Sequence, residues 1–199
     1  MKPVKGEIMR VVGGKYRGRV IKSMPKREDT KLLRPTTERV KESVFSILNN
    51  YLDGTKFLDL FAGTGAVGIE ALSRGAKKVV FVENDRRFCN LIRENLKKLK
   101  VPEEKYEIIC SDYTDALKKL ARRGEVFDFI YADPPYEKGY YTRIVNMVRK
   151  LGLLDRDGLL ILEEPKKNPF IPEDEEWLVE KRHYGTTTVS FLNFNPEEE

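Results

Sequence analysis

Between residues 56 and 163 the chain alternates short apolar runs with amphipathic segments, and this alternation constrains the fold more than any other feature. The apolar runs have the length of buried strands and lie at 56–60, 78–82, 106–110, 127–132 and 159–163. Helices are expected between them, at 66–74, 86–99, 113–122 and about 139–151. Strands that alternate with helices predict a mostly parallel sheet with helices on both faces.

The segments on either side of this run have a different pattern. Residues 7–22 hold two β-rich runs around Gly13 and Gly14, which favour a hairpin. At the other end, 177–182 and 186–194 flank a turn at Tyr184 and Gly185 and predict an antiparallel hairpin that closes the sheet.

A polar loop and one further helix connect the first hairpin to the alternating run. Residues 23–35 read as the loop, and Thr36 or Thr37 can cap a helix that runs to about Tyr51. We therefore expect two parts, a basic N-terminal hairpin and loop at 1–35 and an α/β domain at 36–199.

Positive charge is concentrated at the N-terminal end of the chain. The net charge is +5, and residues 1–50 hold 13 Lys and Arg against 5 Asp and Glu. Such a segment attracts phosphates and releases their counterions, although a solvated basic surface remains the alternative. The residues expected to contact nucleic acid are Arg10, Lys15, Arg17, Arg19, Arg34 and Arg39.

The composition argues against several other classes of protein. Cys89 and Cys110 belong to no CxxC pair, so we expect buried free thiols and no metal site. His183, the single histidine, stands in an apparent turn and is a poor candidate for catalysis. No apolar run approaches the roughly 20 residues that span a bilayer. The N-terminus lacks the apolar core of a secretory signal, and a cytoplasmic, membrane-free monomer is expected.

A glycine-rich turn follows the first strand of the alternating run. Residues 63–68 read GTGAVG, and glycines at such spacing let a backbone approach a ligand at the N-terminus of a helix. The residues of this segment assigned to a cofactor site are Asp59, Phe61, Gly63, Thr64 and Gly65.

Acidic residues end the next two strands. Glu83, followed by Asn84, is placed to bind both hydroxyls of a ribose. Asp112, followed by Tyr113, can accept from an adenine amino group, cap a helix, or do both. These residues fit NAD as well as they fit S-adenosylmethionine.

The fourth strand ends in YADPPY (131–136), the most specific motif in the chain. Pro134 and Pro135 make a rigid loop without amide donors, so the Asp133 side chain and the Pro134 carbonyl can both accept hydrogen bonds. Two such acceptors orient an amine on a nucleic-acid base and stabilise the charge that develops as it is alkylated. The Tyr136 ring is expected to stack on a base turned out of its helix.

Taken together, the motifs resemble the RsmD family of small-subunit ribosomal RNA guanine-2-amino methyltransferases. The resemblance rests on five segments: RVVGGKYRGR (10–19), LRPTTERVKESVFSIL (33–48), FLDLFAGTGAVGIEALSRGA (57–76), VFVEND (80–85) and YADPPY. It implies a seven-stranded Rossmann-like methyltransferase sheet, S-adenosylmethionine as cofactor, and ribosomal RNA or the small subunit as partner. It also implies that 63, 65, 83 and 112 hold the cofactor and that 133–136 hold the target base.

Three other functions remain open from the residues themselves. A DNA or RNA adenine amino-methyltransferase fits DPPY equally well, since the local chemistry does not choose the base. An NAD-dependent enzyme fits the glycine spacing but lacks a substrate domain. A non-catalytic RNA-binding assembly factor could keep the same scaffold. Neither cysteine adjoins a catalytic motif, which favours direct methyl transfer without a covalent enzyme intermediate.

Overall fold

The computed structural model describes residues 9–23, 38–135, 139–167 and 169–195. Arg34, Thr36, Thr37 and Tyr136, each of which has a role predicted from the sequence, lie outside the described residues.

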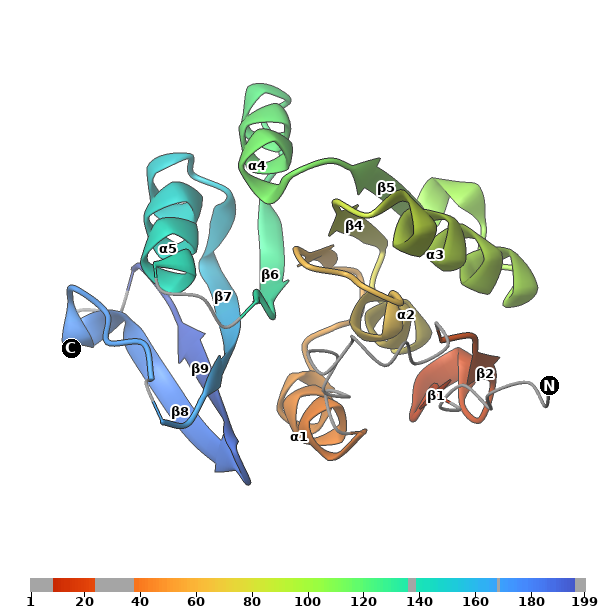
Figure 1. Cartoon of the computed structure of the whole chain (residues 1–199), viewed down its shortest axis with the longest axis horizontal. Coiled ribbons are helices and arrows are strands. Elements are labelled where there is room, and N and C mark those ends of the chain that lie inside the picture. Colours follow the sequence, from red (N-terminus) through yellow and green to blue (C-terminus); the bar gives the residue numbers. More distant parts are fainter. Residues whose placement is uncertain (1–8, 24–37, 136–138, 168, 196–199) are drawn as a thin grey trace, which may run out of the picture.

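One seven-stranded sheet forms the centre of the protein, with the strands in the order β5-β4-β3-β6-β7-β9-β8. Its strands are β3 (Lys56–Asp59), β4 (Lys78–Glu83), β5 (Tyr106–Cys110), β6 (Phe127–Ala132), β7 (Leu154–Pro165), β8 (Leu178–Tyr184) and β9 (Thr187–Leu192). Strands β3 to β7 are parallel, whereas β9 pairs antiparallel with both β7 and β8. The predicted sheet, mostly parallel with a terminal hairpin, is confirmed (Figure 1).

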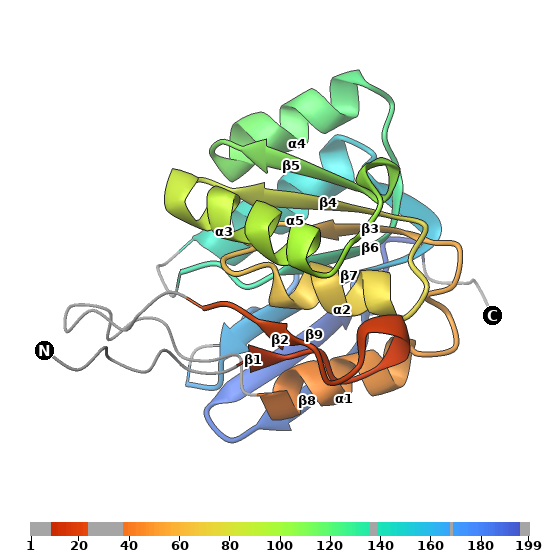
Figure 2. The same ribbon diagram turned by 90° about the vertical axis from the view of Figure 1, so that its right-hand side faces the viewer.

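The described residues include five α-helices, which cover the two faces of the sheet. They are α1 (Glu38–Leu48), α2 (Ala66–Ser73), α3 (Arg86–Lys98), α4 (Tyr113–Arg122) and α5 (Tyr140–Lys150). Helices α1, α2 and α3 share a buried cluster with one face, and α4 and α5 share another with the opposite face. Figures 1 and 2 show α4 and α5 on the side of the sheet away from α1 and α2. None of the described helices is both long and apolar enough to cross a membrane.

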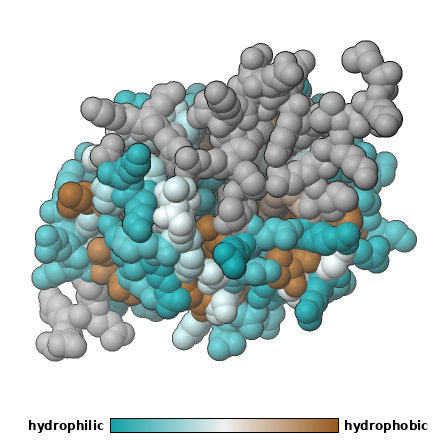
Figure 3. Space-filling model, turned by 60° about the horizontal axis from the view of Figure 1, so that its bottom comes forward, coloured by the Kyte–Doolittle hydropathy of each residue, from teal (hydrophilic) through white to brown (hydrophobic). Residues whose placement is uncertain are grey.

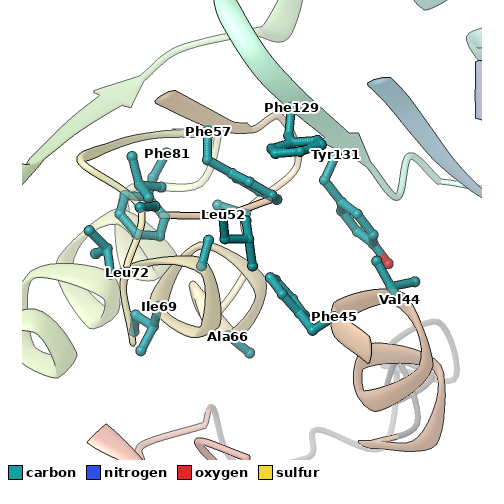
Figure 4. Packing of buried hydrophobic residues seen from close by; sticks show 14 of the residues in the cluster. Val44, Phe45, Leu52, Phe57, Ala66, Ile69, Leu72, Phe81, Phe129 and Tyr131 are labelled. Carbon is teal, nitrogen blue, oxygen red and sulfur yellow. The ribbon is translucent and has the colours of Figure 1, made fainter. Parts of the chain in front are cut away.

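Aromatic rings from three neighbouring strands build the core on the α1–α2 face. Phe57, Phe81 and Phe129 project from β3, β4 and β6 towards the helices (Figure 4). The ring of Phe57 stacks on Phe45 of α1 with 6.1 Å between centroids. This packing fixes where α1 crosses the sheet.

Helix α1 ends earlier than its sequence pattern predicts. Leu48 is its last residue, and the chain then turns, with the Tyr51 amide donating to the Leu48 carbonyl at 2.8 Å. The side chain of Tyr51 is 68 % exposed. The two asparagines after Leu48 are weak helix formers, and Tyr51 has no buried contact that would extend the helix to it.

The N-terminal hairpin forms as predicted, but its strands are short and its connection is long. Strands β1 (Met9–Arg10) and β2 (Val20–Ile21) pair antiparallel, and a single 3-10 turn (Gly14–Tyr16) lies between them. Gly14 has a φ of 71°, and a Cβ there would stand 1.8 Å from the Ser73 carbonyl oxygen at the end of α2. The loop therefore packs closely against α2 and does not form a tight two-residue turn.

A buried carboxylate joins this hairpin to the helices. Glu70 of α2 is fully buried, and its two oxygens accept from the amides of Val12 and Gly13, each at 2.8 Å. Arg74 donates to the same carboxylate at 2.8 Å, and the Lys41 ammonium stands 3.5 Å away and donates to the Arg10 carbonyl. Burial lowers the pKa of Lys41, and the Glu70 charge opposes that shift.

Replacement of Glu70 by Gln is expected to destabilise the protein strongly. The change leaves the buried Lys41 charge and the partly buried Arg74 charge without their carboxylate, a loss of about 3–5 kcal/mol. Denaturant titration of both proteins gives the free energy of unfolding. The control is Glu94→Gln, which removes the exposed Lys22–Glu94 pair and should cost at most about 1 kcal/mol. Equal losses for the two variants would contradict a structural role for Glu70.

The prediction of two free, buried thiols is wrong. Cys89 and Cys110 form a disulfide, and Cys110 is exposed. The cause is the pairing of β5 beside β4, which brings the end of β5 to the first turn of α3. There the two Cα atoms lie 6.1 Å apart, within the usual span of a disulfide.

Candidate functional site

A cavity of about 1270 Å³ opens at the carboxyl ends of the parallel strands. Residues that end or follow β3, β4, β5, β6 and β7 line it, together with residues of α1 and the turn between β8 and β9. The strand order reverses between β3 and β6, and open α/β sheets bind ligands at such a reversal. The cavity is therefore the candidate site.

The glycine turn and the acid of β4 hold each other in place on one side of the cavity. Glu83 accepts from the Gly63 amide at 2.8 Å through Oε2, and from the Asp85 amide at 2.9 Å through Oε1. Gly63 has a φ of 52°, and a Cβ at this position would meet nothing within 4 Å. The backbone of the turn thus faces open space beside a fixed carboxylate.

The other residues predicted to bind a cofactor also converge on the cavity, with one exception. Asp59, Phe61, Thr64, Asn84 and the pair Asp112–Tyr113 line it. Gly65 is absent from the lining; it begins α2 with a φ of 79° and packs near Ile92.

Asp112 directly precedes the first residue of α4 and is exposed. It accepts from the Thr114 amide at 2.8 Å, so the predicted helix cap is confirmed. Tyr113 is buried beside it, with its ring 5.1 Å from Phe61 and 5.7 Å from Tyr140. These three rings make an aromatic wall. Tyr140 was not predicted, and its only sequence signal is an aromatic residue at the start of the helix after the DPPY motif.

Asp59 is a buried acid between the two halves of the cavity. Its side chain is 2 % exposed and accepts from the Gly68 amide at 2.9 Å. Burial raises the pKa of Asp59 to about 7; the Gly68 hydrogen bond opposes this shift and the Glu83 charge adds to it. Asp59 therefore changes charge near neutral pH.

The Asp-Pro-Pro segment leaves β6 on the opposite side of the cavity. Asp133, Pro134 and Pro135 all line it, as the sequence motif predicts. The motif and the glycine turn thus share one cavity, although 70 residues separate Gly63 from Asp133.

A tyrosine and a glutamate beside this segment were not predicted. The Tyr131 hydroxyl donates to Oε2 of Glu163, and both side chains are buried and line the cavity. Burial, then the charges of Glu163 and Asp133, raise the pKa of Tyr131 well above its ordinary value, so it remains a donor. Glu163 lies near the end of a parallel strand, as Glu83 does, and that position is the signal that could have identified it.

The predicted basic residues fall into two groups. Arg39 of α1 lines the cavity, whereas Arg10, Lys15, Arg17 and Arg19 are exposed on the hairpin and do not. Hydrophilic residues dominate the coloured part of the side that carries α1 and the hairpin (Figure 3). His183 is part of β8 and not of the predicted turn, with its Nδ1 2.8 Å from the Thr188 hydroxyl of β9.

Comparison with known proteins places this geometry in a family. The family model described as "Conserved hypothetical protein 95" matches residues 9–193, nearly the whole chain. The chain belongs to the RsmD family. The "Ribosomal RNA small subunit methyltransferase D" of Haemophilus influenzae is 36 % identical over 178 residues, which are 89 % of each protein.

Two further family relatives extend over almost all of the chain. The "Putative rRNA methyltransferase YlbH" of Bacillus subtilis is 35 % identical over 184 residues, 92 % of this chain and 97 % of that protein. The solved structure "Putative methyltransferase yhhF from Escherichia coli" superposes with a TM-score of 0.82 at 28 % identity, covering 96 % of this chain and all of that one. The RsmD assignment therefore covers the hairpin, the sheet and the cavity together.

The pH dependence of stability tests the raised pKa of Asp59. Unfolded, Asp59 ionises near pH 4, but in the fold it keeps its proton until about pH 7. Its contribution is therefore fully present below pH 4 and is lost as pH rises to 7, by about 1.4 kcal/mol per pH unit. Asp59→Asn should remove this loss, as measured by denaturant titration without cofactor between pH 4 and 8. Parallel pH curves for the two proteins would show that Asp59 ionises normally.

Proposed function

We propose that this RsmD-family protein transfers the methyl group of S-adenosylmethionine to the 2-amino group of a guanine in small-subunit ribosomal RNA. The observation that carries the proposal is the single cavity shared by the glycine turn with Glu83 and by the Asp-Pro-Pro segment. One side suits a nucleoside cofactor and the other suits an amine.

The residues on the first side fit S-adenosylmethionine. A carboxylate has about four acceptor positions, and Glu83 uses one on each oxygen for backbone amides, which leaves capacity for two ribose hydroxyls. Asp112 accepts from the adenine amino group, and the aromatic wall of Phe61, Tyr113 and Tyr140 packs against the ring. Bound there, S-adenosylmethionine supplies an electrophilic methyl group.

The charge of the cavity suits a sulfonium cation. Eight acids, among them Glu83, Asp133 and Glu163, line it against the two bases Arg39 and Lys41, and an excess of one sign of charge concentrates ions of the opposite sign. The same charge repels phosphates, so the RNA backbone must bind outside the cavity. The exposed arginines of the hairpin, with Arg39 at the rim, provide that contact in the proposed function.

Asp133 and the Pro134 carbonyl act on the amine. They accept its two hydrogens, which turns the nitrogen lone pair towards the methyl group and stabilises the positive charge that develops on nitrogen. Positioning supplies much of the remaining acceleration. The proton leaves to water after transfer. No cysteine is a nucleophile in this scheme, and Cys89 and Cys110 are bonded to each other.

Methyl transfer to ribosomal RNA tests the proposal directly. The protein is incubated with labelled S-adenosylmethionine and unmodified small-subunit RNA, both naked and assembled, and the products are digested to nucleosides for mass spectrometry. Label in the amino group of guanosine supports the proposal. Label in adenosine instead would favour the adenine alternative, and transfer to duplex DNA alone would overturn the RNA assignment.

Replacement of Asp133 by Ala should separate catalysis from cofactor binding. Turnover is expected to fall at least ~100-fold, the usual cost of losing one preorganised hydrogen-bonding group at a reacting atom. Affinity for S-adenosylmethionine, measured by calorimetry, should stay within a few-fold of wild type. A large loss of cofactor affinity would contradict the assigned role.

Replacement of both Arg17 and Arg19 by Ala should weaken RNA binding. Removal of each ion pair with a phosphate reduces the steepness of the dependence of log affinity on log salt by about 0.9 for duplex and 0.7 for single strands. The matched control changes Lys118 and Lys119, two exposed residues of α4 on the other side of the sheet. An unchanged slope in the hairpin variant would make these arginines ordinary surface charges.

A further inference from the structure

The Asp-Pro-Pro segment does not by itself select a base. Its two acceptors fit the amino group of guanine, adenine or cytosine, because all three present the same two hydrogens. The choice among them must come from the atom beside the amine. The guanine amine has two ring nitrogens beside it, and one of them, N1, carries a hydrogen. In adenine and cytosine the ring nitrogen beside the amine carries a lone pair.

Glu163 is placed to contact that atom. Strands β6 and β7 are parallel neighbours, with Tyr131 opposite Ile161 and Ala132 opposite Leu162. Asp133, the first residue after β6, and Glu163 of β7 directly follow the last of these pairs, and neighbouring strands lie about 4.8 Å apart. Both line the cavity, so a base whose amine lies at Asp133 has its ring edge towards Glu163.

The carboxylate of Glu163 is also held in a fixed orientation. Glu163 is 2 % exposed, and the Tyr131 hydroxyl donates to its Oε2. Burial of a carboxylate is costly unless hydrogen bonds offset the lost hydration, and Tyr131 supplies one. A carboxylate has about four acceptor positions, so a glutamate that accepts from Tyr131 can also accept from a base.

We propose that Glu163 selects guanine by accepting the N1 hydrogen of the target base, with Tyr131 as its positioning residue. Adenine or cytosine would place a ring lone pair against this carboxylate, and the repulsion would exclude them. The inference rests on the proposed function and deepens it, because it names the group that recognises the base.

Base analogues that keep the amine and change its neighbour test this role. Small-subunit RNA is prepared with guanine, 2,6-diaminopurine or 2-aminopurine at the methylated position. All three carry a 2-amino group, but only guanine has a hydrogen on N1. Wild type should prefer guanine in kcat/KM by roughly 10- to 100-fold, the discrimination typical of a directional hydrogen-bonded contact to a base.

Two variants assign this preference to Glu163. In Glu163→Gln the amide can accept from Tyr131 and donate to an unprotonated N1, so the guanine preference should fall to near one or invert. Tyr131→Phe should lower the preference less. The control is Glu164→Gln on the same strand, because Glu164 bonds Ser190 and does not line the cavity. It should leave the preference at the wild-type value, whatever its effect on stability.

The possible outcomes distinguish failure of the Glu163 role from failure of the proposed function. If wild type methylates none of the three RNAs, the proposed function fails and the inference with it. If wild type methylates guanine and the analogues equally, or if Glu163→Gln keeps the wild-type preference, Glu163 does not select the base and the proposed function stands. If Glu163→Gln fails to fold, the wild-type ratio and its change in Tyr131→Phe decide the question.

Discussion

The register of the parallel strands decides which side chains meet at the site. Asp59 pairs with Phe81 on β4 and with Tyr131 on β6, and Tyr131 pairs with Ile161 on β7. Side chains alternate along a strand, so the acids two residues beyond Phe81, Tyr131 and Ile161 lie on the α1–α2 face. The same rows that build the aromatic core therefore deliver Asp59, Glu83, Asp133 and Glu163 to one cavity.

The burial and mutual repulsion of these acids oppose folding, and local hydrogen bonds offset that free-energy cost. Glu83 accepts two backbone amides, Asp59 accepts one, and Glu163 takes the Tyr131 hydroxyl. What remains is a pocket whose excess of acids favours cations, including a sulfonium group and the ammonium that develops on a methylated amine. In the proposed function, the acids whose repulsion and burial destabilise the ligand-free protein stabilise the positive charges of the cofactor and of the methylated amine.

The sequence predicted those parts of the site that adjacent residues specify. The alternation of strands and helices is local, as are the glycine turn, Glu83 and the Asp-Pro-Pro segment, and the structure brings them together at one cavity. The Tyr131–Glu163 pair spans 32 positions, and the contact of Glu70 with the Val12 amide spans 58. These partners come together through strand register and helix packing, which a local sequence pattern does not predict. The disulfide was missed for the same reason.

A crystal structure with S-adenosylhomocysteine tests the central claim most directly, because it shows whether the cofactor binds in the cavity that the Asp-Pro-Pro segment lines. The account predicts the ribose hydroxyls on Glu83, the adenine between Asp112 and the aromatic wall, and the sulfur directed towards Asp133. A ligand bound elsewhere, or one whose sulfur points away from the Asp-Pro-Pro segment, would contradict it.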